Sequence, residues 1–223
     1  MPVSLPLFTL SPWIQAILGF ILILNLGLLA AERQQICIRL LALQGAAISL
    51  LPLVMEWDEA SWTLFLLTIA FLAIKGFVLP HMLRRAHRTL PASAPVPPYL
   101  GYTRCVLAGL LGFAFSLWLA VSMPTPANPH FLALFAPAFG TILTGLLLIV
   151  TRRKALTQIM GYLVMENGIF LLGIPLARGD TYWLELTVML DIWVGIFVMV
   201  LAIYHLNRAV QTTDVDRINS LRD

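Results

Sequence analysis

The chain has 223 residues, of which 60% are hydrophobic and only 11% are charged, and its mean hydropathy is +0.89. A soluble domain carries about a quarter charged residues, so this composition excludes a water-soluble globule. The apolar residues come in runs of roughly 20, enough for a helix to cross about 30 Å of hydrocarbon. The sequence therefore predicts an all-α fold, a polytopic bundle of transmembrane helices.

Seven apolar runs predict seven transmembrane helices along the chain. Each run is too long for a strand of a membrane β-barrel and lacks the alternation of such strands. No basic residue precedes Arg33, so the start of the chain lacks the positive region of a signal peptide, and we expect the first run to be retained as a span. The predicted spans are 11–30, 36–55, 62–83, 102–123, 131–150, 155–176 and 182–206.

A proline-rich stretch divides these spans into two groups. Residues 91–98 read PASAPVPP, a composition that favours an extended linker and does not continue a helix. We therefore predict a three-helix membrane half over 1–88, a cytoplasmic linker over 89–98, a four-helix membrane half over 99–206 and a cytoplasmic tail over 207–223.

The basic residues gather on one side of the predicted membrane. The loops on the other side carry Arg178 and four acidic residues, Glu56, Asp58, Glu59 and Asp180. By the positive-inside rule, the carboxyl terminus is cytoplasmic and the amino terminus lies outside, as an odd number of helices requires. The turn 152–154 is interpreted as part of this topology signal or as a docking point for a cytoplasmic partner. Of 14 Lys and Arg, 12 fall on the cytoplasmic side: Arg33, Arg39, Arg84, Arg85, Arg88, Arg104, Arg152, Arg153, Lys154, Arg208, Arg217 and Arg222.

Three ionisable residues fall inside the predicted spans: Lys75, Glu166 and Asp191. A charge near the bilayer centre costs roughly 2.5–3.5 kcal/mol on insertion scales, so such groups face protein or water. Burial disfavours the charged forms of all three groups, which favours proton exchange near neutral pH. One interpretation is a proton or ion path. The others are a structural ion pair of Lys75 with either carboxylate, or a Lys75 side chain that extends to the cytoplasmic face.

Three further polar residues are weaker candidates for this path. Gln44 and Asn25 lie within spans, where a single amide more commonly hydrogen-bonds a neighbouring helix than joins an ion path. His81 follows Pro80 at the end of the third span and could pass protons to Lys75, because histidine titrates near neutrality. Alternatively, His81 is an interfacial residue within the basic turn that follows the third span.

The remaining motifs exclude several other functions. Cys37 and Cys105 are expected to be small core residues, because no second cysteine or histidine is spaced to form a metal site. No phosphate loop, nucleophile triad or haem ligand pair is present, and the basic residues do not form a nucleic-acid-binding patch. We expect no cofactor, no nucleic acid and no catalysis by this chain alone. A faint internal repeat relates residues 41–52 to residues 163–175, as in some transporters.

Residues 151–168, TRRKALTQIMGYLVMENG, resemble hydrogenase-4 component E, a membrane subunit of group 4 nickel–iron hydrogenases. The G-Y-x-x-M-E-N-G run is the hallmark, and Lys75 with Pro80 matches the family's K-x-x-x-x-P pattern. The last three spans also resemble the K subunit of respiratory complex I. Leu163 stands where that family has an intramembrane glutamate, with Glu166 about one helical turn further on, and Asp191 aligns with the second glutamate.

The resemblance implies a non-catalytic subunit of an energy-converting hydrogenase or complex I-like oxidoreductase in the bacterial or archaeal cytoplasmic (inner) membrane. Its partners would be antiporter-like and other membrane subunits, a peripheral redox arm and the lipid bilayer. Its proton or sodium path would include Glu166, Asp191 and Lys75, with His81 and Gln44 as weaker members. The alternatives are a purely structural scaffold subunit, a subunit of a cation/proton antiporter-like complex and a stand-alone transporter.

Overall fold

The computed structural model describes residues 10–57, 61–89, 97–123 and 129–175, together with the single residues 189, 193 and 195. Every regular element in these ranges is helical, and no strand occurs among them. Helices α3, η3 and α4 follow one another without a break and form one continuous helix. The elements are α1 (Pro12–Ala30), α2 (Gln34–Met55), α3 (Trp62–Ala73), η3 (Ile74–Val78), α4 (Leu79–Thr89), α5 (Tyr102–Ser122), α6 (Pro129–Thr151) and α7 (Ala155–Gly173).

Six helices in the described part of the chain are long and apolar enough to cross a membrane. Each coincides with one of the first six predicted spans, so the prediction of an all-helical, multi-pass membrane protein is confirmed. The third helix runs to Thr89, beyond the predicted end at residue 83 and one residue into the predicted linker. The span predicted at 182–206 lies outside the described residues except for three isolated positions, and the total of seven spans stays a prediction.

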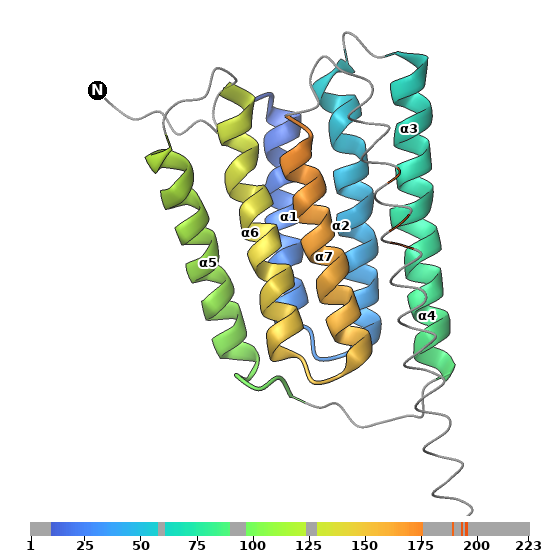
Figure 1. Ribbon diagram of the computed structural model, residues 1–223, viewed down its shortest axis with the longest axis vertical. Helices are drawn as coiled ribbons and strands as arrows, with labels where there is room; N and C mark the ends of the chain where they lie inside the picture. Colours follow the sequence, from blue (N-terminus) through green and yellow to red (C-terminus); the bar gives the residue numbers. More distant parts are fainter. Residues whose placement is uncertain are drawn as a thin grey trace, which may run out of the picture.

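The helices stand side by side, with α1, α2, α6 and α7 in the middle of the bundle (Figure 1). Helix α5 packs on one flank against α6 and α1, and the α3–η3–α4 helix packs on the other flank against α2. Both flanking helices leave large apolar side chains exposed, such as Phe77, Leu111 and Trp118. These exposed faces are suited to contact with lipid tails or with other membrane subunits.

One end of the bundle carries the basic residues. The α1–α2 turn, the α6–α7 turn, the end of α4 and the start of α5 all lie at the lower end in Figure 1. The basic residues predicted on the cytoplasmic side therefore share one end wherever the chain is described, from Arg33 to Lys154. Which side of the membrane this end faces stays a prediction.

Glycines let α6 and α7 approach unusually closely. A Cβ added to Gly145 of α6 would lie 2.6 Å from the carbonyl oxygen of Gly161 in α7, and one added to Gly168 would lie 2.7 Å from the amide nitrogen of Ile142. Small residues are the common means by which helices pack in a membrane, where no hydrophobic force drives association. The α6–α7 hairpin is accordingly the most extensive helix–helix contact among those described.

We predict that Gly145→Ala separates α6 from α7, because the new methyl group meets main-chain atoms that cannot move aside. Overpacking of this kind costs about 1–3 kcal/mol, and thermal unfolding of the purified chain in detergent measures the loss. Gly19→Ala in α1 is the matched control, since its added Cβ has no atom within 4 Å. Equal stability of the two variants would contradict the close approach.

Candidate functional site

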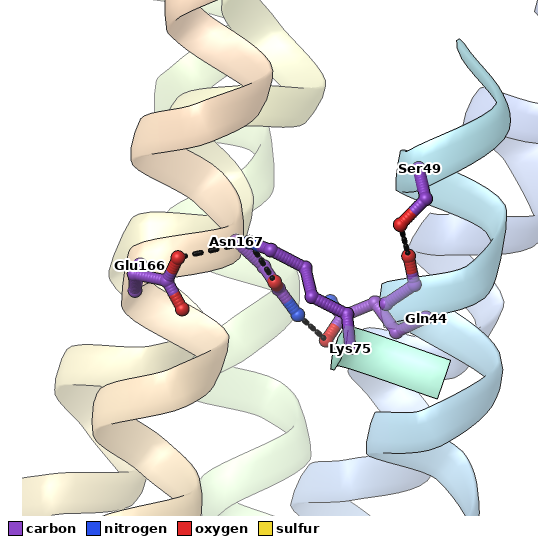
Figure 2. Close-up of polar contacts among 6 residues, drawn as sticks. Gln44, Ser49, Lys75, Glu166 and Asn167 are labelled. Carbon is purple, nitrogen blue, oxygen red and sulfur yellow. Dashed lines mark hydrogen bonds and ion pairs between the residues drawn. The ribbon is translucent and has the colours of Figure 1, made fainter. Parts of the chain in front are cut away.

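An ion pair is buried in the middle of the bundle. The Nζ atom of Lys75 lies 2.8 Å from Oε1 of Glu166 and donates a second hydrogen bond, of 3.0 Å, to Oδ1 of Asn167 (Figure 2). It also lies 4.7 Å from the ring centroid of Phe170. Lys75 is only 4% exposed and Glu166 only 6%. The lysine thus has an anion, an amide oxygen and an aromatic face around it in place of water.

A turn of π-helix presents Lys75 to its partners. The residues of η3, Ile74–Val78, interrupt the α-helical pattern, and the amide of Leu79 bonds to the carbonyl of Ile74 five residues back. Pro80 follows directly and has no amide hydrogen to offer to Gly76, which removes one α-helical bond from this turn. Single π-turns of this type are frequent at functional sites. The K-x-x-x-x-P pattern of the sequence therefore corresponds to a local change in helical winding.

Gly45 allows α2 to pack directly against this π-turn. A Cβ at Gly45 would lie 2.9 Å from Cβ of Lys75 and 3.2 Å from its carbonyl oxygen. Any larger residue at this position would push the two helices apart. The neighbouring residue, Gln44, is fully buried as a result.

A chain of hydrogen bonds extends from the ion pair across the bundle. Nδ2 of Asn167 donates to Oε1 of Gln44 (3.4 Å), and Nε2 of Gln44 donates to Oδ1 of Asn25 (2.7 Å). Nδ2 of Asn25 in turn donates to Oγ1 of Thr141 (2.8 Å), whose hydroxyl donates to the carbonyl of Pro137 (2.7 Å). We call the set Asn25, Gln44, Lys75, Thr141, Glu166 and Asn167 the polar layer.

The polar layer lies between two apolar clusters and runs across the helices. In each contributing helix, its residue falls between a member of one cluster and a member of the other. The side-chain hydrogen bonds of the layer run from helix to helix, whereas the buried hydroxyls of Ser49, Thr68 and Thr144 outside it bond to carbonyls of their own helices. The flanking residues are Ile21 and Leu28 in α1, Leu41 and Ala47 in α2, Phe71 and Leu83 in the α3–η3–α4 helix, Ala138 and Leu148 in α6, and Val164 and Phe170 in α7.

The structure brings together some of the residues predicted for an ion path. Lys75, Glu166 and Gln44 all belong to the polar layer, whereas His81 is exposed on α4 and takes no part in it. Asp191 lies outside the described residues. The pairing of Lys75 is with Glu166, one of the two carboxylates that the sequence left open.

The sequence reasoning missed two members of the polar layer. Asn167 directly follows Glu166 in the M-E-N-G run, so the motif itself was a signal that both residues matter. Thr141 had no comparable signal, because a threonine in a span usually bonds to its own helix, as Thr144 does to Gly140. Its second contact, with Asn25, depends on how α1 and α6 face each other.

Lys75 and Glu166 are the only members of the layer with ionisable side chains, so the arrangement is chemically capable of proton exchange or of stabilising a charge. No group of three or more His, Cys, Asp or Glu side chains is placed to hold a metal within the residues that the structure covers. Fold and site define a multi-pass membrane protein with an ionisable pair at the middle of its spans.

Comparison with known proteins identifies the family. Residues 130–223 match the family model for NADH-ubiquinone/plastoquinone oxidoreductase chain 4L. The uncharacterized protein Rv0085 of Mycobacterium tuberculosis is 31% identical over 189 residues, 83% of this chain and 85% of that protein. Hydrogenase-4 component E of Escherichia coli K12 is 29% identical over 148 residues, 66% of this chain and 68% of that protein, and the Shigella flexneri protein gives the same values. No solved structure matches significantly.

The chain therefore belongs to the hydrogenase-4 component E family, which is related through its carboxyl-terminal part to chain 4L of NADH-ubiquinone oxidoreductase. The predicted resemblance is confirmed. Within the described residues, the region that matches the chain 4L model comprises the α6–α7 hairpin, which carries Thr141, Glu166 and Asn167. Membership implies a place in a multi-subunit membrane assembly of the complex I type.

We predict that Gln44→Leu destabilises the protein. The substitution leaves two side-chain atoms, Nδ2 of Asn167 and Oδ1 of Asn25, without their hydrogen-bond partner in an apolar interior. An unsatisfied buried polar group costs about 1–3 kcal/mol, which thermal unfolding in detergent detects. Ser49→Ala is the control one helical turn away, since that hydroxyl bonds only to the Gly45 carbonyl of its own helix. A Gln44→Leu variant as stable as Ser49→Ala would show that the chain of hydrogen bonds is not continuous.

Proposed function

We propose that this chain is a non-catalytic integral membrane subunit of an energy-converting hydrogenase or related complex I-like oxidoreductase, in which it contributes to proton (or sodium) translocation coupled to electron transfer. Family membership supports the assembly, and the buried Lys75–Glu166 pair supports the role in translocation. The proposed partners are antiporter-like and other membrane subunits and a peripheral redox arm, in the bacterial or archaeal inner membrane.

The observation that carries the proposal is the arrangement around Lys75. If Glu166 takes up a proton, the ammonium keeps Oδ1 of Asn167 as acceptor and the ring of Phe170 as a cation–π partner. The lysine therefore has alternative stabilisation in the state where its counter-ion is neutral. A buried pair without such alternatives holds one protonation state much more strongly.

The rest of the polar layer has a different part in this proposal. Amide and hydroxyl side chains do not ionise near neutral pH, so Gln44, Asn25 and Thr141 do not store protons. They orient Asn167 and stabilise the charge distribution around the pair. On the basis of their positions in the sequence, Asp191 and His81 are proposed as further proton-exchanging residues of the ion path.

We predict that Glu166→Gln leaves electron transfer measurable but strongly lowers proton pumping by the assembled complex. Glutamine keeps the size and one acceptor for Lys75 but cannot take up a proton. Pumping is measured as pH change in inside-out vesicles during electron transfer, and Glu56→Gln at the end of α2 is the control for the same chemical change. Unchanged proton pumping by the Glu166→Gln variant would contradict the proposal that Glu166 takes up protons during translocation.

A purely structural role is the second candidate, because the polar layer joins five spans to one another. The double variant Lys75→Met, Glu166→Met separates the two roles, since removal of both partners leaves no unpaired buried charge. We expect this variant to assemble, as judged on a native gel, and to lose pumping. Loss of assembly would favour the structural role, and assembly with normal pumping would exclude the pair from the ion path.

A further inference from the structure

The basic end of the bundle contains a small polar cavity where two turns meet. The cavity has a volume of about 20 Å³ and lies between the α1–α2 turn and the α6–α7 turn. A volume of this size accepts one water-sized atom. Its lining residues are Glu32, Gln34, Cys37, Arg152, Arg153, Lys154 and Thr157.

Arg152 is buried at this cavity with one donor unused. Its side chain is only 4% exposed, and one terminal nitrogen donates to the carbonyls of Leu28 (3.1 Å) and Leu29 (2.9 Å) at the end of α1. Its guanidinium also lies over the ring of Tyr102, 5.1 Å from the centroid. Nε has no hydrogen-bond partner, and it is the one buried side-chain nitrogen or oxygen in this condition among those described. A buried N–H that lacks a partner costs about 1–3 kcal/mol, so an acceptor is expected beside it.

The surroundings favour an anion as that acceptor. Three cationic side chains and one carboxylate, Glu32, line the cavity, which leaves a net positive charge. The amino-terminal ends of α2 and α7 both point to this region, and neither has a side-chain cap. Uncapped helix amino termini present free amide hydrogens and a positive dipole to anions.

We propose that this cavity and its mouth bind a phosphate group, with one oxygen in the cavity beside Nε of Arg152 and the other oxygens at the mouth near Arg153 and Lys154. A phosphate oxygen has the size that the cavity accepts. Arg153 is held at the mouth by stacking on Tyr99, 4.3 Å from its ring centroid. The ends of membrane-spanning helices lie at the level of lipid headgroups, and basic pockets between helices there bind anionic lipids. The headgroup of an anionic phospholipid and free phosphate share this chemistry.

The test uses the purified full chain in dodecyl maltoside, titrated separately with dioleoylphosphatidylglycerol, dioleoylphosphatidylcholine and inorganic phosphate. Ligand binding raises the unfolding temperature, which gives an affinity for each probe. Stabilisation by phosphatidylglycerol but not phosphatidylcholine identifies a lipid headgroup, and stabilisation by inorganic phosphate identifies a soluble ligand. No specific stabilisation by any probe would leave a cavity that holds water and would overturn the proposal.

Two sets of variants make the result specific to the cavity. Arg153→Gln combined with Lys154→Gln should weaken binding at least about tenfold, because charged hydrogen bonds are lost. Glu32→Gln should strengthen binding severalfold, because a repelling carboxylate at an exposed position is removed. Arg104→Gln, an exposed change at the same end that does not line the cavity, should have little effect. An unchanged affinity in the double variant, or weaker binding in Glu32→Gln, would refute the site.

Discussion

The buried ion pair between Lys75 and Glu166 is the interaction on which the arrangement of the bundle depends. Removal of one partner from such a pair commonly costs 3–5 kcal/mol, because the other charge is left in an apolar interior. The π-turn of η3 presents the lysine, Gly45 lets α2 approach it, and Asn167 supplies a second acceptor. Three local features that are individually unfavourable or unusual therefore serve one contact.

The α6–α7 hairpin joins this contact to the basic end of the protein. Its glycines bring the two helices together closely enough that Thr141 and Asn167 both reach the polar layer from adjacent helices. At the other end of the same hairpin, Arg152 binds the last carbonyls of α1. The same hairpin therefore makes contacts both in the middle of the bundle and at its basic end.

The sequence predicted the helices well and their facing surfaces poorly. Hydropathy alone located six spans to within a few residues, because a run of about 20 apolar residues has few alternatives in a bilayer. It ended the third helix too early, since Arg84 and Arg88 lower hydropathy while the backbone stays helical. Lys75 and Glu166 were found because charges are costly at membrane depth. Thr141 and the buried role of Arg152 depend on helix rotation and on contacts between distant segments, which a single sequence does not encode in its composition.

The orientation of the polar layer has a consequence for energetics. A charge that crosses the membrane does work of about 2.3 kcal/mol for every 100 mV of transmembrane potential. The hydrogen bonds of the polar layer join neighbouring helices and do not run along any one of them, so a charge displaced along the layer moves mainly across the bundle and little along the electric field. Rearrangements within the layer are therefore almost independent of voltage. The work against the membrane potential must be done where ions enter and leave this level, at steps outside the hydrogen-bonded layer itself.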